Sequence, residues 1–235
     1  MENNFNRSAD YKKHIFTDFE ISEKVKTGEF AWDTLLTINE TSGSKRYVLN
    51  FAARHGYMNT LAALRDAGLT GEQIDQTFPL FTAAKNNQIA AMEALMRMDE
   101  GTCNLNMEVQ IRENGKSRFY PNMLFYFFDV LPKVSGRVRE GHIRAFWSLV
   151  YYGINICDKP EDEVKNRMGY SIIDLIYLNR VKPEVNELID FAVLFFGFRA
   201  PALNSIEDIK EFFEEIECAQ LQSVVDSYGF EHCFA

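Results

Sequence analysis

Two neighbouring segments of the chain, residues 47–68 and 78–95, share one pattern of apolar and polar positions. Each begins with apolar residues, contains two consecutive alanines and continues, after a short polar stretch, with apolar residues at helical spacing. Leu49 and Leu80 occupy equivalent positions 31 residues apart. A fixed period of this length predicts stacked pairs of helices, because one pair cannot bury its apolar face without a neighbour.

The same helical periodicity extends in a weaker form to both ends of the chain. Near the N-terminus, Trp32, Leu35 and Leu36 are apolar residues at helical spacing. They predict part of a helical cap. The predicted organisation is a single elongated domain over residues 1–235, with an N-terminal capping unit at 10–40, repeats at 44–73 and 75–104, a hairpin insertion at 105–120, two divergent repeats with insertions at 121–200, and a C-terminal capping helix at 204–230.

The second half departs from the simple pattern. Twelve residues lie between Phe128 and Gly141, where the repeat leaves room for two. Gly197 follows a helical pattern through Val185 and Leu188, which predicts the second helix of a fourth unit. From residue 204, an apolar stripe opposes acidic residues, as expected of a helix that seals the last unit and shows water a polar face.

Residues 106–120 predict a β-hairpin. Val109 and Ile111 alternate with polar residues, and Asn114-Gly115 precedes a second run that ends at Tyr120. Asn-Gly between extended runs favours a tight hairpin turn, since both turn residues need a positive φ. Such a hairpin is either a lid over one edge of the stack or a finger that contacts a partner.

These features resemble the ankyrin repeat family. The family's motif opens with Thr-Pro-Leu-His, continues with Ala-Ala and two variable residues, and then has Gly-His before a second helix that ends in Leu-Leu and Gly. The matching positions are Val48 to Ala53, Gly56-Tyr57 and Gly68 in one unit, and Pro79-Leu80, Ala83-Ala84 and Asn87 in the next. The resemblance implies an all-α, ankyrin-type solenoid with helical caps, which binds a protein partner in a concave groove.

The resemblance also implies where the partner binds. The variable pair of each unit points into the groove, loop-tip residues extend it, and aromatic residues nearby supply anchors. An acidic or mixed-charge protein surface is the natural complement. The alternative is an ordinary solvated helix surface. The residues implied are Arg54, His55, Lys85 and Asn86 as variable pairs, Arg46 and Thr77 at the loop tips, and Tyr57, Phe119 and Tyr120 as aromatic anchors.

A second candidate site is a group of cations in the long insertion and just after it. Four positive charges in an acidic chain could hold a phosphate or an acidic loop through charge-assisted hydrogen bonds. The alternative is a solvated insertion, because no glycine-rich phosphate cradle accompanies them. The residues are Lys133, Arg137, Arg139 and Arg144.

Composition limits the possible functions. The 235 residues include 46% hydrophobic and 25% charged residues, with a formal net charge of −9. A chain this acidic is not expected to bind nucleic acid or anionic membranes in general, because such binding needs a positive field. No stretch is long and apolar enough to span a bilayer, and no signal peptide is evident. Four scattered cysteines indicate reduced thiols and a cytoplasmic protein.

The sequence predicts no enzyme, cofactor or metal site. The carboxylates between Asp158 and Glu163 do not have the spacing of a calcium loop. The alternative is an active site hidden in the irregular half, residues 106–200, using Cys103 or Cys157 with His142, although no catalytic motif surrounds them. We expect His142 instead to form a structural hydrogen bond across a turn.

The C-terminal region has a second resemblance. The acidic and aromatic residues at 211–217, close to the apolar end at Phe230 to Ala235, are similar to the terminal signals of type IV secretion substrates of intracellular bacterial pathogens. That similarity implies a secreted effector that binds a host protein in the host cytoplasm. The alternative is a cytosolic adaptor, scaffold or inhibitor.

Overall fold

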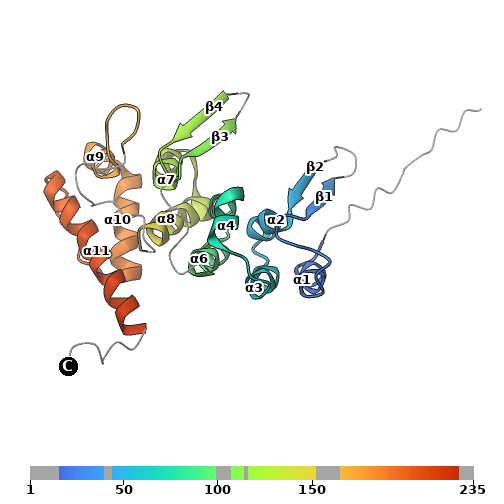
Figure 1. The fold of residues 1–235 in the computed structure, drawn as a ribbon. Helices are drawn as coiled ribbons and strands as arrows, with labels where there is room; N and C mark the ends of the chain where they lie inside the picture. Colours follow the sequence, from blue (N-terminus) through green and yellow to red (C-terminus); the bar gives the residue numbers. More distant parts are fainter. Residues whose placement is uncertain (1–15, 40–43, 99–106, 114–115, 152–164, 228–235) are drawn as a thin grey trace, which may run out of the picture.

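The computed structural model describes residues 16–39, 44–98, 107–113, 116–151 and 165–227 (Figure 1). It is mostly helical, with 64% helix, and the described residues also form two small antiparallel sheets. The predicted predominance of helix is confirmed. The helices are α1 (Asp18–Lys26), α2 (Val48–His55), α3 (Met58–Asp66), α4 (Gly71–Thr77), α5 (Pro79–Lys85), α6 (Ile89–Met98), α7 (Met123–Val130), α8 (Gly136–Tyr151), α9 (Ile172–Leu178), α10 (Pro183–Phe196) and α11 (Ile206–Ser227), with a 3₁₀ turn η1 (Leu131–Lys133). The strands are β1 (Leu35–Asn39), β2 (Ser44–Tyr47), β3 (Val109–Glu113) and β4 (Lys116–Tyr120).

Local sequence explains where several of these helices begin. Thr17 begins α1 with a capping box, in which its hydroxyl accepts from the Glu20 backbone N–H and Glu20 accepts from Thr17. Ser171 begins α9 in the same way, with Asp174 as its partner. Such caps satisfy N–H groups that have no partner within the helix. Pro79 lies at the first turn of α5, where its missing N–H is not needed.

The two repeated segments form neighbouring pairs of helices. α2 packs against both α3 and α5, and α5 against α6, while α3 contacts α6 and α1. Ala53 and Ala84, which are equivalent in the repeat, are both fully buried. Their small side chains allow the helices to approach closely. The predicted adjacency of the two alanine-containing helices is therefore confirmed.

The turns of successive pairs also touch one another. Gly56 ends α2 with φ 67°, and Asn87 follows α5 with φ 59°, both in the left-handed conformation that stops a helix. The side chain of Gln88 lies against Gly56, and that of Asn87 lies against Gly141 of α8. Each turn is thus packed against the next unit along the row.

Two hairpins project from the same side of the helical row, the side of α2 and α7 (Figure 1). β3 and β4 pair in the register Glu113 to Lys116, which confirms the predicted hairpin; its Asn114-Gly115 turn lies outside the described residues. β1 and β2 form a second antiparallel pair. The predicted helix through Leu35 and Leu36 is wrong, because this segment is strand β1.

Most of the long insertion, residues 129–140, is helical and does not form an open loop. α7 runs to Val130, η1 follows, and α8 begins at Gly136. Gly141 and His142 therefore lie inside α8. His142 does form a structural hydrogen bond, as expected, but within a helix rather than across a turn between helices: its Nδ1 is 2.8 Å from the carbonyl oxygen of Val138, one turn earlier in α8.

α8 connects the two halves of the molecule. The Ser148 hydroxyl donates to Glu93 of α6 at 2.9 Å, and the Trp147 indole N–H donates to the Leu188 carbonyl of α10 at 2.6 Å. The Trp147 ring stacks on Phe213 of α11 with a centroid distance of 5.3 Å. α10 ends at Gly197, as predicted, and α11 confirms the predicted C-terminal helix, although residues 228–230 of the expected range lie outside the described residues.

Candidate functional site

The residues predicted to bind a partner lie on several different elements. Arg46 lies on β2 and Arg54 in the last turn of α2, whereas Thr77 ends α4. Lys85, at the end of α5, is exposed and occupies the position equivalent to Arg54. The structure brings Arg46 and Arg54 close enough for their charges to interact.

Arg46 and Arg54 form a cationic pair with unmet hydrogen-bonding capacity. Burial lowers the pKa of Arg46, and the charge of Arg54 lowers it further. The Arg46 Nε is buried and lacks an acceptor, and neither guanidinium has a carboxylate partner among the described residues. Two neighbouring guanidinium groups favour binding of a carboxylate, which would relieve their repulsion and accept their N–H bonds.

Among the described residues, two further buried side-chain atoms have no hydrogen-bond partner. They are the side-chain oxygens of Asn50 and Thr77. The two residues are neighbours, because the Asn50 side-chain amide donates to the Thr77 carbonyl at 2.6 Å. Each unsatisfied buried polar group costs roughly 1–3 kcal/mol.

Lys85 and Tyr120 lie at either end of a group of aromatic rings. The Lys85 ammonium is 5.9 Å from the Phe81 ring centroid and 5.7 Å from that of Tyr126. Phe81 and Tyr126 meet edge to face at 4.8 Å, and Tyr126 meets Tyr120 at 5.5 Å. Lys85 and Tyr120 were predicted separately as partner-binding residues. The structure connects them through one cluster of aromatic rings from α5, α7 and β4.

Three of the nominated residues have roles in the fold itself. The Tyr57 hydroxyl donates to the Phe16 carbonyl at 2.7 Å, and burial, followed by the charge of Asp18, raises its pKa. The Asn86 side chain donates to the Thr82 carbonyl at 2.7 Å and closes the end of α5. The His55 ring packs 5.6 Å from that of Tyr57. Of the three, only His55 is exposed.

The four cations of the insertion do not share one site. Lys133 pairs with Asp129 of α7 at 2.7 Å. Arg139 pairs instead with both carboxylate oxygens of Glu187 in α10, at 3.1 and 3.2 Å, and also donates to the Val134 carbonyl. Arg137 and Arg144 are exposed on α8. Two of the four charges are therefore already neutralised, by carboxylates of different elements.

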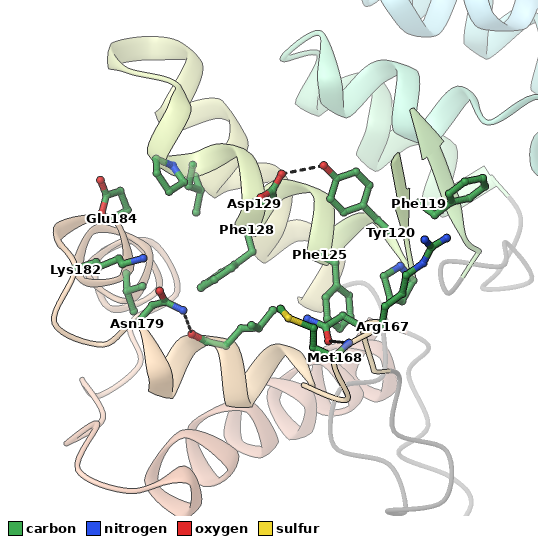
Figure 2. Close-up of a pocket in the computed structure, with 16 residues that line it drawn as sticks. Phe119, Tyr120, Phe125, Phe128, Asp129, Arg167, Met168, Asn179, Lys182 and Glu184 are labelled. Carbon is green, nitrogen blue, oxygen red and sulfur yellow. Dashed lines mark hydrogen bonds between the residues drawn. The ribbon is translucent and has the colours of Figure 1, made fainter. Parts of the chain in front are cut away.

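A cavity of about 410 Å³ lies between β4 and α7 on one side and α9 on the other (Figure 2). Its volume is in the range of ligand-binding pockets. The predicted Phe119 and Tyr120 belong to its wall, but the rest of the lining was not predicted. The lining residues are Phe119, Tyr120, Pro121, Phe125, Phe128, Asp129, Leu131, Pro132, Asn166, Arg167, Met168, Leu175, Asn179, Lys182, Glu184 and Val185.

Asp129 ties the hairpin to the cavity wall. It accepts hydrogen bonds from the Tyr120 hydroxyl at 2.9 Å and from the Lys133 ammonium at 2.7 Å, with Arg118 at 3.5 Å. Burial would raise the pKa of Asp129, but the hydrogen bonds from Lys133 and Tyr120 outweigh it and the pKa is lowered. Burial and the bond to Asp129 raise the pKa of Tyr120. Asp129 is thus ionised and supplied with donors.

The opposite edge of the cavity is formed by a well-defined turn. The side-chain oxygen of Asn166 accepts from the backbone N–H groups of Met168 at 2.9 Å and Tyr170 at 3.1 Å. Arg167, within this turn, places its guanidinium 5.2 Å from the Phe119 ring centroid. The turn therefore holds Arg167 at the β4 end of the cavity, beside Phe119 (Figure 2).

The residues considered for catalysis are not assembled in the described part of the chain. Cys103 and Cys157 lie outside the described residues. His142 is buried, and burial lowers its pKa. In the described ranges, no three His, Cys, Asp or Glu side chains are grouped closely enough to hold a metal ion. None of the helices described here is long and apolar enough to cross a membrane.

Comparisons with protein-family models, with curated proteins and with solved structures gave no match.

Proposed function

We propose that this chain is an ankyrin-type recognition module that binds an acidic surface of a protein partner through its hairpin side. The observation that carries the proposal is the Arg46–Arg54 pair, two neighbouring guanidinium groups without a carboxylate partner among the described residues. A partner carboxylate would offset the repulsion between the two guanidinium charges. The net charge of −9 makes such a basic site the exception on this chain.

Three features support the ankyrin-type interpretation. Helix pairs 31 residues apart lie side by side, with fully buried alanines between them. Residues with positive φ, Gly56 and Asn87, end the first helix of each pair. Hairpins project from the same side of the row (Figure 1). A surface that combines hairpins with the first helices is the groove that the resemblance implies, and repeat proteins use such extended surfaces for binding.

The partner is a cytoplasmic protein, of the host cell if the chain is exported as an effector. The structure limits how the C-terminal segment would act as a secretion signal. Phe212 and Phe213, within residues 211–217, are buried against Trp147. In the folded chain only the acidic side of this segment is accessible, so a receptor that also needs the aromatic residues would have to act before α11 docks.

Affinity capture from a eukaryotic lysate tests the proposal. The intact protein is compared with a double variant, Arg54→Glu and Lys85→Glu, which reverses two charges on the proposed surface. A second double variant, Arg137→Glu and Arg144→Glu, makes the same charge change on exposed positions of α8 and serves as the matched control. We expect the first variant to lose partners that the intact protein and the control retain. Equal retrieval by all three would show that the surface is not the binding site.

A further inference from the structure

We propose that the cavity between α7 and α9 binds an aromatic side chain from an acidic linear peptide, which is a segment of the protein partner. This inference rests on the proposed function and adds the chemistry of the recognised motif. Three properties of the cavity support this inference: the chemistry of its interior, the charges of its rim and the free edge of the strand beside it.

The interior of the cavity is apolar and rich in aromatic rings. Phe125 and Phe128 of α7 line one side, and Leu175 and Val185 line the α9 and α10 side. Figure 2 shows Met168 approaching from the turn opposite Phe125 and Phe128. Aromatic rings pair favourably edge to face or offset, and a thioether makes favourable contacts with a ring. An aromatic guest gains from both, whereas an aliphatic guest gains only from burial.

The rim of the cavity offers two cations. Arg167 and Lys182 lie on opposite sides of the mouth (Figure 2). Arg167 lies over the Phe119 ring, and neither cation forms an ion pair in the described part of the chain. The rim also has two carboxylates. Asp129 is already supplied with donors by Tyr120 and Lys133, which leaves Glu184 as the single carboxylate to balance two cations.

The unequal charge of the rim favours acidic residues on either side of the aromatic anchor. An Asp or Glu on one side would reach Arg167, and one on the other side would reach Lys182. Glu184, next to Lys182, disfavours a longer run of acids on that side. The motif expected is therefore an aromatic residue with an acidic neighbour on each side rather than a continuous acidic tract.

The strand beside the cavity favours a peptide over a free small molecule. β4, which contributes Phe119 and Tyr120 to the wall, pairs with β3 alone among the described strands. Its second edge keeps backbone donors and acceptors that an extended peptide could use, as in strand addition to a sheet edge. A small anion could satisfy the rim but not this edge.

Selection from a displayed library of random dodecapeptides, against the full chain, tests the proposal. We expect enriched peptides to share an aromatic residue with Asp or Glu on both sides. The best of these is then synthesised and its affinity is measured by fluorescence polarisation. Leu175→Trp, which fills the cavity, and the exposed double variant Arg167→Glu and Lys182→Glu should each weaken binding at least about tenfold. Arg137→Glu with Arg144→Glu, on α8, should leave the affinity unchanged.

The outcomes separate this inference from the proposed function. Enrichment of peptides without an aromatic residue, enrichment of aromatic peptides without acids, or no enrichment at all would overturn the inference. Peptides that bind both cavity variants normally but lose affinity with Arg54→Glu and Lys85→Glu would leave the proposed function standing and overturn the inference. If Leu175→Trp does not fold, the rim variant decides the result alone, because both of its positions are exposed.

Discussion

Asn87, two residues after the end of α5, lies with its side-chain amide directly against Gly141 in the middle of α8. A β-carbon at Gly141 would overlap the Asn87 side-chain oxygen and carbon. The two residues are 54 positions apart in the sequence, and their contact fixes how closely the second helical pair approaches α8.

The first prediction concerns this contact. Gly141→Ala should destabilise the protein by about 1–3 kcal/mol through overpacking, even though alanine is favoured over glycine inside a helix by about 1 kcal/mol. Urea denaturation measures the free energy of unfolding. The double variant with Asn87→Gly should recover most of the loss, since glycine suits the positive φ and leaves room for the new methyl group. A Gly141→Ala protein as stable as the parent would contradict the close packing.

The second prediction concerns the Arg46–Arg54 pair. An anionic peptide such as pentaglutamate should raise the melting temperature of the intact protein, because it binds the folded state at unpaired guanidinium groups. The rise should be smaller for Arg54→Gln, which removes one of the two charges. Sodium chloride at equal ionic strength controls for screening, and pentalysine controls for the sign of the charge. Identical shifts for the intact protein and the variant would rule out this pair as the anion-binding position.

The third prediction concerns Asp129 and Tyr120. Because the pKa of Asp129 is lowered in the folded state, its stabilising effect is present above the ordinary value of 3.8 and is lost as the pH falls through the folded pKa. Asp129→Asn should therefore cost stability at neutral pH and little in strong acid. The carboxylate is partly exposed, so the loss should be below about 1 kcal/mol.

Tyr120 provides the complementary test at high pH. Its pKa is raised in the folded state, so its contribution is full below the ordinary value of 10.0 and is lost as the pH rises through the folded pKa. Tyr120→Phe should flatten the alkaline part of the stability profile. It should also weaken the acidic part, because Asp129 loses the hydrogen bond from Tyr120, but should not abolish it, because Asp129 keeps the bond from Lys133. Denaturation curves measured across the pH range for both variants check this, and an alkaline part that Tyr120→Phe leaves unchanged would contradict the raised pKa of Tyr120.

The fourth prediction concerns His142. Its pKa is lowered by burial, so its contribution to stability is full above the ordinary value of 6.5 and declines as the pH falls through the folded pKa. His142→Gln should reduce the pH dependence of unfolding in mildly acidic buffer. His55→Gln, at an exposed position, serves as the matched control. If both variants keep the slope of the parent, a different group accounts for the acid sensitivity.

Local signals in the sequence predicted much of the fold. The Asn-Gly pair located the β3–β4 hairpin, and Gly197 located the end of α10. Leu35 and Leu36 were misleading because two adjacent apolar residues fit a helical stripe as well as a strand, and only pairing with β2 decides between them. The α4 helix was also missed, although Thr70 forms a capping box with Gln73 that is visible in the sequence.

The cavity is harder to predict because its walls come from segments far apart in the sequence. The unusual length between Phe128 and Gly141 was evident, and Asp129 and Leu131 of that stretch do line the cavity. Nothing in the local sequence around Arg167 indicates that its guanidinium lies over Phe119, since that contact depends on how α9 docks beside α7. Long-range docking, rather than local preference, creates the site.

The position of α8 affects how cooperatively the molecule unfolds. A row of repeats held only by nearest neighbours can lose its outer members one at a time. Here a single helix is fastened to α6 through Ser148 and to α10 and α11 through Trp147. Unfolding that starts at the C-terminal end would therefore also expose α8 and α6 in the middle of the row. We expect the helices that pack on α8 to unfold in a single cooperative transition.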